Sequence, residues 1–362
     1  MLFSSFHARD QELARCMIAL RDARNAYARS QGYDNYFSLE LAQMGFTQKI
    51  VHSDVREWFK QMHALPSFPD ETMRSLSPIE SLYDTRDVTR RVVERLGLGD
   101  AYDRITQYEL GNGGETPKTI PIDPPREVAV VVPYNSTNLW VKNAFFSEIG
   151  HGLHYASMKD DLPYMFRLGS NAMPWREAMD ALFVRLATMH IREDPTIKEG
   201  KLLEAIDYER KIRSLCGTMI RTFFDAYFYT TTEQNPDVIL REWKRIKLDL
   251  YGKDRPLYAV VDVPDGYERV VHEWANDSWI TERPVELGFL LGAMIAAQIR
   301  AYWLKNGGTL LSREFGAWIR ETCWEPGFSK PWRELLRDAT GEDFNPRYFL
   351  DELEEMKRQR SG

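Results

Sequence analysis

Hydrophobic side chains recur along most of this chain at the three- and four-residue spacing that is typical of amphipathic helices. Leu13, Met17 and Leu20 follow this spacing in the first such segment. It runs over residues 8–30 and ends before Gly32. The same spacing, with Gly and Pro near the boundaries, predicts further helices over residues 33–44, 53–64, 87–96, 138–155, 176–191, 199–230, 236–250, 284–305, 312–321 and 332–339. We therefore expect a mainly α-helical protein.

One short segment has a different pattern. Residues 128–132 are rich in β-branched side chains and are followed by Pro133, and this composition predicts a strand. Residues 111–125, directly before it, hold seven glycine and proline residues, which predicts a loop. We expect one small sheet beside the helices.

Composition narrows the class of protein. With 43% hydrophobic and 28% charged residues, the chain is typical of a soluble globular protein. A net charge of −7 implies no basic face, which argues against a nucleic-acid partner. Residues 1–10 lack a signal-peptide pattern, and the apolar stretch 287–299 is too short to span a bilayer, so we expect a buried helix there and no membrane partner. The widely spaced Cys16, Cys216 and Cys323 favour a reducing compartment, so we expect a cytoplasmic protein.

Residues 147–151 read Ser-Glu-Ile-Gly-His within the helix predicted over 138–155. In the H-E-x-x-H motif of zinc peptidases, two histidines one turn apart hold the metal, and the glutamate acts as general base on the metal-bound water. Glu148 and His151 occupy the corresponding positions, but Ser147 stands where the first histidine belongs. A serine hydroxyl is shorter than an imidazole and is a poor neutral ligand. Either a metal is bound differently here, or the chain no longer hydrolyses peptides.

The motif and three further segments carry a family resemblance. Residues 145–155 resemble the H-E-[IFM]-G-H-[AG]-[LM]-H motif of the oligoendopeptidase F, thimet oligopeptidase and angiotensin-converting-enzyme families. Residues 24–36 are similar to the R-N-x-x-A-x-x-x-G-Y-x-N-Y stretch of these families. Residues 290–298 resemble their L-L-G helix, and residues 326–342 resemble their C-terminal P-G-x-S-x-x-W and A-T-G-E segments. Nearly the whole chain thus resembles the gluzincin superfamily of zinc metallopeptidases.

The resemblance implies a mainly α, metallopeptidase-type catalytic domain over residues 1–362. It implies two lobes around a cleft, a helical lobe of residues 1–110 and a lobe of residues 111–362 that carries the motif. A small antiparallel sheet at the cleft would use residues 128–132 as its edge strand, on which an extended substrate pairs. Relatives have additional N-terminal helices that form a lid, and this chain begins about where that lid ends. We expect a cleft that lacks this lid and is open or covered by a partner subunit in a homo-oligomer.

The resemblance also implies roles for three residues. Glu148 is the candidate general base or acid and, alternatively, a metal ligand, and His151 is a candidate metal ligand or acid–base group. Glu177, on the helix that follows Pro174, matches the third ligand of glutamate-type zinc peptidases. One histidine with two carboxylates is a harder ligand set than two histidines with one, so the cofactor would be zinc or another divalent metal. Metal-free acid–base catalysis, with no cofactor, is an equal alternative.

Five further side chains are expected at the substrate cleft, namely Ser147, His154, Asp180, Glu286 and Val130. His154 would have a structural role or support the metal ligands from behind. Asp180, one turn after the candidate third ligand, would orient the motif histidine or stay a solvated acid. Glu286 would supply a new carboxylate to the cleft, and Val130 lies on the strand expected to pair with substrate.

Residues 283–289 are a second departure from the family pattern. The peptidases take tyrosine, and often histidine, from this segment to stabilise the oxyanion of the tetrahedral intermediate. The segment contains neither residue type here. Loss of a ligand together with the oxyanion donors indicates a natural change of use.

Three functions are compatible with these residues. The first is a repurposed enzyme that acts on a small amino-acid-like or peptide-like substrate, in a biosynthetic pathway, by acid–base or metal-assisted chemistry. The second is a zinc-dependent oligopeptidase with an altered metal site, and the third is a non-catalytic pseudopeptidase that binds peptides. The first ranks highest because the departures argue against ordinary proteolysis, whereas the retained Glu148, His151 and Glu177 argue against simple decay.

Overall fold

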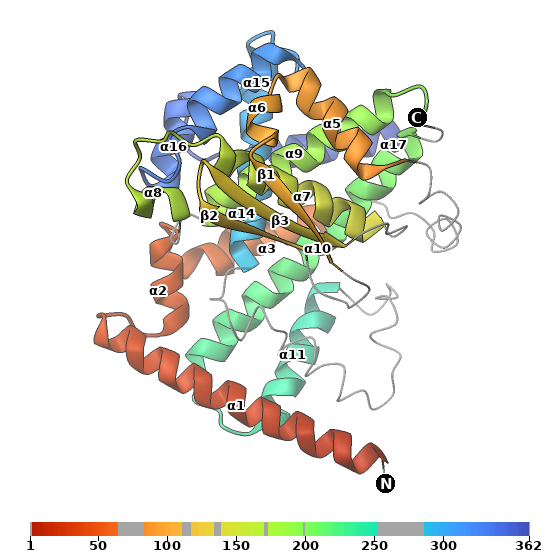
Figure 1. The fold of residues 1–362 in the computed structure, drawn as a ribbon. Helices are drawn as coiled ribbons and strands as arrows, with labels where there is room; N and C mark the ends of the chain where they lie inside the picture. The colour runs from red at the N-terminus through yellow and green to blue at the C-terminus, as the bar shows by residue number, and fades with distance from the viewer. Residues whose placement is uncertain are drawn as a thin grey trace. The chain divides into compact units, whose positions relative to one another are not determined.

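The computed structural model describes residues 2–63, 83–110, 117–133, 139–169, 173–197, 200–251 and 286–361, whose helices and strands are drawn in Figure 1. The chain divides into two compact units. One comprises Met1–Ala64 and Ser214–Leu287, and the other comprises Leu65–Arg213 and Gly288–Gly362. The two lobes suggested by the family resemblance, residues 1–110 and 111–362, stay a prediction.

The described residues of the first unit form helices. Its elements are α1 (Leu2–Ser30), α2 (Tyr36–Gln43), the π-helical turn η1 (Val51–Val55), α3 (Arg56–His63), the C-terminal part of α10 (Gly200–Thr230) and α11 (Pro236–Tyr251). The buried Asn25 side chain joins three of these helices. Its Nδ2 donates to the main-chain oxygen of Tyr229 at 2.9 Å, and its Oδ1 accepts from the main-chain nitrogen of Tyr36 at 2.8 Å. The R-N segment that carries part of the family resemblance therefore ties α1 to α2 and α10.

The second unit contains the sheet and the remaining helices. Its elements are α5 (Thr85–Leu96), α6 (Gly99–Tyr102), β1 (Ile105–Leu110), β2 (Lys118–Asp123), β3 (Glu127–Pro133), α7 (Leu139–Ala156), α8 (Tyr164–Leu168), α9 (Met173–Glu193), the N-terminal part of α10, most of α14 (Glu286–Lys305), α15 (Arg313–Ile319), the π-helical turn η3 (Arg320–Trp324), α16 (Trp332–Thr340) and α17 (Arg347–Ser361). The mainly α fold class predicted from the hydrophobic spacing is confirmed. The spacing missed α6, α8 and α17.

The three strands of the sheet lie in the order β1-β3-β2. β2 runs antiparallel to β3, with Thr119 opposite Val130, whereas β1 runs parallel to β3, with Gln107 opposite Val130. The sheet is therefore mixed, and β3 is its central strand and not the expected edge strand. Residues 118–123 form a strand within the stretch that was expected to be a loop. Pro121 fits there because β2 lies at an edge of the described sheet, next to a register shift.

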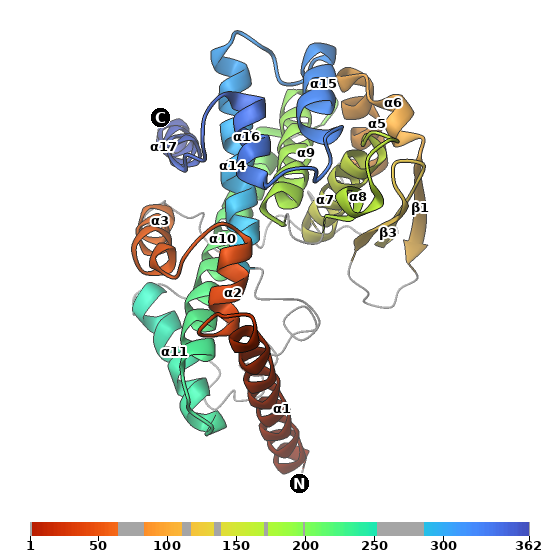
Figure 2. The same ribbon diagram turned by 90° about the vertical axis from the view of Figure 1, so that its left-hand side faces the viewer.

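Helix α7 lies between the sheet and α9, as Figure 1 and Figure 2 show from two directions. Its approach to the sheet depends on Gly152. A Cβ at this position would lie 3.0 Å from Ile105 Cδ1 and 3.1 Å from Val130 Cγ2, which is tighter than most contacts of a real side chain. The glycine thus lets the motif helix sit directly on the strands.

Helix α14 is the one helix among the described residues that is long and apolar enough to cross a membrane. However, 72% of its most apolar window is buried inside the protein. That burial is typical of the core helix of a soluble protein, as the sequence predicted for residues 287–299.

Candidate active site

Helices α7 and α9 come unusually close to each other where the motif lies. The cause is Gly150, because a Cβ there would lie 2.9 Å from Asp180 Cα and 2.9 Å from Phe183 Cβ, closer than real Cβ atoms come. Positions 147 and 151 lie one turn apart on α7 and share one face of the helix. That face meets the acidic residues of α9.

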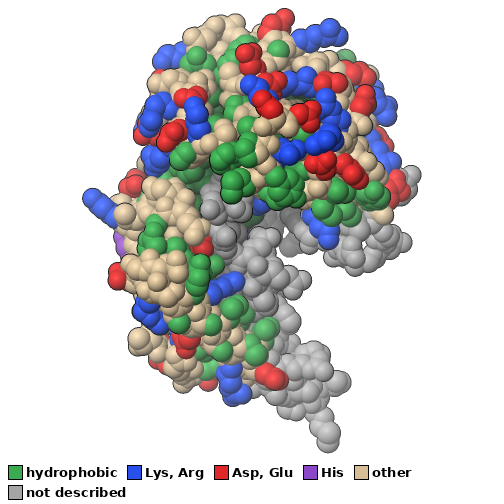
Figure 3. All heavy atoms as spheres, turned by 60° about the vertical axis from the view of Figure 1, so that its left-hand side comes forward, with side chains coloured by type: hydrophobic (Ala, Val, Ile, Leu, Met, Phe, Trp, Pro, Cys, Tyr) green, Lys and Arg blue, Asp and Glu red, His purple; other side chains and the backbone are tan. Residues whose placement is uncertain are grey.

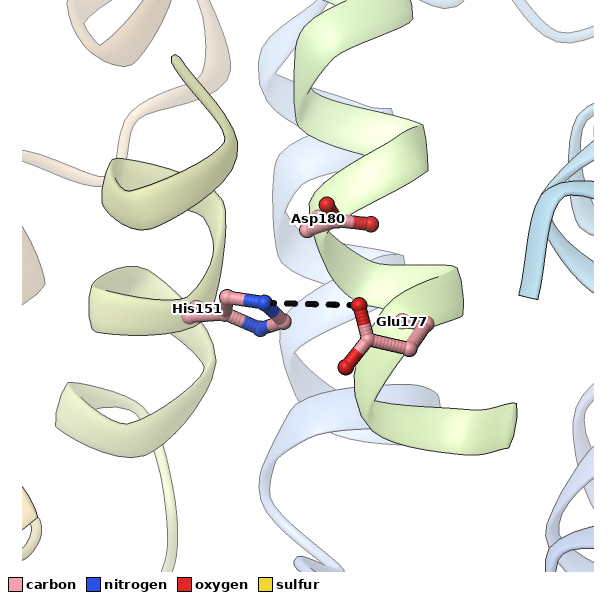
Figure 4. Close-up of side chains that lie close together, drawn as sticks. All are labelled: His151, Glu177 and Asp180. Atoms are coloured by element: carbon pink, nitrogen blue, oxygen red, sulfur yellow. Dashed lines mark ion pairs between the residues drawn. The ribbon is translucent and has the colours of Figure 1, made fainter. Parts of the chain in front are cut away.

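His151, Glu177 and Asp180 form a compact polar cluster between the two helices (Figure 4). One potential ligand atom from each residue lies within 4.8 Å of the other two. His151 Nε2 lies 3.8 Å from Glu177 Oε2. The three residues are only 8%, 3% and 7% exposed, respectively. The structure therefore brings together His151 and Glu177, which the sequence proposed as ligands, and adds Asp180 to them.

Ser147 contacts the same cluster from α7. Its hydroxyl donates a short hydrogen bond to Asp180 Oδ2. The sequence placed Ser147 and Asp180 separately at the substrate cleft, with Asp180 orienting the motif histidine or facing solvent. In the structure Asp180 is buried and is bonded to the residue that replaces the first histidine.

Glu148 points toward the sheet. Thr119 Oγ1 lies 2.7 Å from Glu148 Oε2 and 2.8 Å from the main-chain oxygen of the same residue. Burial raises the pKa of Glu148, while His151 and the Thr119 hydrogen bond lower it. A carboxyl with a raised pKa exchanges its proton closer to neutral pH, which suits a general acid or base.

Sequence reasoning missed Thr119 as a functional residue. The prolines around it predicted a loop, although Thr119, Ile120 and Ile122 are β-branched residues of the kind found in strands. These β-branched residues were the signal in the sequence that could have predicted strand β2 and drawn attention to Thr119.

Arg176 was also missed. Its Nε and Nη2 each lie 3.0 Å from Glu177 Oε1. Burial nevertheless raises the pKa of Glu177 to about 7, against the lowering effect of Arg176. The Arg176 guanidinium therefore contacts Oε1 of Glu177. The other oxygen, Oε2, faces His151 (Figure 4). The one signal in the sequence for a role of Arg176 was its position directly before the candidate ligand Glu177.

The two motif histidines have different surroundings. Burial lowers the pKa of both, and that of His154 falls to about 3. The His154 ring lies edge-on to Phe328, with ring centroids 5.1 Å apart. Both ring nitrogens of His154 lack a hydrogen-bond partner among the described residues, and so does Nδ1 of His151. His154 is thus a neutral core residue, whereas His151 is a neutral imidazole that faces two carboxylates.

Val130 and Glu286 have other contacts among the described residues. The Val130 side chain is fully buried, next to Gly152 of α7. Glu286 belongs to the other compact unit, where its Oε1 lies 2.8 Å from Arg221 Nε in an ion pair. A role of either residue in substrate binding stays a prediction.

The donor set of the cluster fits a divalent metal. Imidazole and carboxylate ligands bind zinc at about 2.0–2.2 Å, so two ligand atoms on one ion lie roughly 3–4 Å apart. The 3.8 Å between His151 and Glu177 matches this spacing. The buried carboxyl groups of Glu177 and Asp180 and the partly buried carboxyl group of Glu148 also lie near the His151 imidazole. A bound cation would compensate their negative charge.

Comparison with known proteins extends this picture. No family model matches the sequence, and no curated protein matches it. Solved structures do match, however. An oligoendopeptidase F structure aligns with 99% of this chain and 66% of its own, at a TM-score of 0.72 and 15% identity. Metallocarboxypeptidase 1 of Trypanosoma cruzi aligns with 98% of this chain and 80% of its own, at a TM-score of 0.63 and 17% identity.

An M32 carboxypeptidase from Deinococcus radiodurans R1 shows the same likeness. It aligns with 98% of this chain and 80% of its own, at a TM-score of 0.62 and 12% identity. At these identities the likeness concerns the fold. The chain shares its fold with these oligoendopeptidase and carboxypeptidase structures.

Proposed function

We propose that this chain is a repurposed enzyme on the metallopeptidase fold that acts on a small amino-acid-like or peptide-like substrate. The observation that carries the proposal is a partly buried acid–base carboxyl, Glu148, beside a histidine–carboxylate cluster. Buried titratable groups with shifted pKa values gather at functional sites far more often than elsewhere. A biosynthetic pathway is the setting we favour, because such pathways use old scaffolds for new reactions.

Each residue has a distinct part in the proposed chemistry. A divalent metal held by His151 and Glu177 would supply Lewis-acid polarisation of a substrate oxygen. Glu148 accepts a proton from the attacking group at its carboxylate and returns it to the leaving group. Thr119 orients that carboxylate through its hydroxyl, and Arg176 keeps one oxygen of Glu177 engaged.

The departures from the peptidase pattern support a changed reaction. Ser147 supplies no imidazole, and its hydroxyl is bonded to Asp180. Residues 283–289 contain no tyrosine or histidine that could stabilise an oxyanion. Removing one oxyanion donor typically costs a factor of about 100 to 1,000 in rate.

A zinc-dependent oligopeptidase with an altered metal site is the second candidate. The likeness in fold to an oligoendopeptidase and to carboxypeptidases favours it. A peptide-binding protein without catalysis is the third, and it differs from both in needing no proton transfer at Glu148.

One experiment separates these candidates. Purified protein loaded with Mn²⁺ or Zn²⁺ is incubated with amino-acid amides, N-acylated amino acids and short peptides, and products are identified by mass spectrometry. We expect turnover that Glu148→Gln lowers by roughly 100-fold or more and that the exposed control Glu94→Gln leaves unchanged. Cleavage of ordinary peptide bonds alone would favour the oligopeptidase. Peptide binding without turnover, unaffected by Glu148→Gln, would favour the binding protein.

We propose a cytoplasmic protein whose partners are small molecules or short peptides, with no nucleic-acid or membrane partner. On the face shown in Figure 3, Lys and Arg side chains are interspersed with Asp and Glu side chains, which supports the absence of a nucleic-acid partner. A homo-oligomer that covers the site is a further proposal, and the mass of the particle in solution tests it.

A further inference from the structure

Asp180 lies where it would complete the ligand set of the cluster. It follows Glu177 by three residues on α9, so both carboxylates share one face of this helix. One carboxylate oxygen lies within 4.8 Å of the candidate ligand atoms of His151 and Glu177. Figure 4 shows the three side chains in the space between α7 and α9. Glu148, which the sequence had offered as a ligand, is instead bonded to Thr119.

Asp180 is held in this place from the opposite helix. The Ser147 hydroxyl donates to its Oδ2. Position 147 is the position at which H-E-x-x-H peptidases carry a metal-binding histidine. In this chain, position 147 does not supply a ligand itself. Its serine hydroxyl instead donates to Asp180, a carboxylate of the neighbouring helix α9 that belongs to the cluster.

The charges around Asp180 point to a bound cation. Arg176 forms an ion pair with Glu177. Among the described residues, the hydrogen bond to Asp180 comes from the hydroxyl of Ser147, which carries no charge. A carboxylate that is only 7% exposed is costly without a compensating positive charge. His151 is 8% exposed and faces the same space, with its Nε2 3.8 Å from Glu177 Oε2. A cation would compensate the carboxylates and use the imidazole as a ligand.

We propose that Asp180 is the third protein ligand of a divalent cation, in place of the histidine that Ser147 replaces, and that Ser147 is the positioning residue for Asp180. The site would then offer one imidazole and two carboxylates. Oxygen donors suit harder cations, so the ratio of Mn²⁺ affinity to Zn²⁺ affinity should exceed that of a site with two histidines. Zn²⁺ would still bind more tightly in absolute terms. This inference rests on the proposed metal-assisted function and names the ligands on which that function depends.

The test measures metal affinity and needs no substrate. Metal-free full-length protein is titrated calorimetrically with Mn²⁺ and with Zn²⁺, alone and against a chelator. Asp180→Asn, which keeps the shape of the side chain, should weaken Mn²⁺ binding by more than the roughly 10- to 100-fold effect of an outer-shell change. Ser147→Ala should weaken it by about 10-fold, and Ser147→Thr, which keeps the hydroxyl, should restore most of the loss. Ser147→His should raise Zn²⁺ affinity more than Mn²⁺ affinity.

Two outcomes of the metal titrations overturn the inference and can be told apart. If Asp180→Asn binds both metals as the unaltered protein does while Glu177→Gln does not, Asp180 is no ligand and the metal-assisted function stands. If the unaltered protein binds neither metal, the metal-assisted function fails as well. X-ray absorption of the Zn²⁺-loaded protein is independent of any variant. One imidazole with oxygen donors supports the proposal, and two or more imidazoles contradict it.

Discussion

The hydroxyl of Thr119 lies 2.7 Å from Oε2 of Glu148, so that strand β2 holds the candidate acid–base group of helix α7. The same hydroxyl lies 2.8 Å from the main-chain oxygen of Glu148. A hydroxyl carries one proton and donates to one of these oxygens at a time. The sheet therefore contributes to the orientation of this carboxyl and to its pKa.

Removing the Thr119 hydroxyl should shift the pH dependence of turnover. Burial raises the pKa of Glu148 above its ordinary value of 4.5, and the Thr119 hydrogen bond partly offsets this rise. Thr119→Val should raise the pKa further, so a general base would lose its charge at a higher pH. We expect the acidic limb of the kcat/KM profile to move to higher pH, whereas Thr119→Ser should leave it in place. A limb that stays unchanged in Thr119→Val would contradict the assigned contact.

Glu177 should make the metal-free protein less stable as the pH rises. Burial raises its pKa from 4.5 to about 7, so the folded state keeps a proton that the unfolded state loses first. The stabilisation is complete below the unfolded pKa and is lost as the pH rises through the folded pKa. Relative to Glu177→Gln, the unaltered protein should lose up to about 3 kcal/mol of unfolding free energy between about pH 5 and pH 8. Urea denaturation at several pH values measures this difference.

The control for that experiment is Glu94→Gln, at an exposed position of α5. It should leave the pH dependence of the unfolding free energy unchanged. The lowered pKa of His151 acts with the opposite sign in the unaltered protein. Parallel curves for Glu177→Gln and the unaltered protein would show that the Glu177 carboxyl is not perturbed.

A side chain at position 150 should separate α7 from α9. In Gly150→Ala the new Cβ would lie 2.9 Å from Asp180 Cα, so a backbone must move. We expect a loss of about 1–3 kcal/mol in unfolding free energy and weaker metal binding. Gly217→Ala is the matched control, because its Cβ would find its nearest neighbour, Arg221 Nη1, at 3.7 Å. That change should be neutral or stabilising by roughly 0.5–1 kcal/mol, and equal effects of both changes would contradict the close packing.

His154 should limit the stability of the protein in acid. Burial lowers its pKa to about 3, so the folded state resists a proton that the unfolded state takes up. The stability is complete above the ordinary pKa of 6.5 and is lost as the pH falls toward the lowered value. His154→Leu should unfold at a lower pH than the unaltered protein and should keep its metal affinity. Circular dichroism during acid titration checks the first point, and lost metal affinity would show that His154 supports the ligands.

The local part of the site could be predicted from the sequence. Glu148 and His151 lie three residues apart on one helix, and helical geometry makes residues at that spacing neighbours. The hydrophobic spacing likewise predicted α7, α9 and α14, since a helix that buries one face leaves a regular pattern in its sequence. The position of β3 within its sheet was predicted wrongly, because neither of the two strands that pair with it, β1 and β2, was predicted from the sequence.

Only the tertiary structure decided which groups meet across elements. The contact of Ser147 with Asp180 depends on the distance and rotation of α9 relative to α7, and Gly150 allows that distance through the absence of a side chain. The contact of Thr119 with Glu148 depends on the pairing register of β2. The sequence by itself determined most of the helices, the mainly α class and the motif with its missing histidine, because these depend on near neighbours in the chain. Packing between distant segments determined which carboxylate accompanies His151 and Glu177.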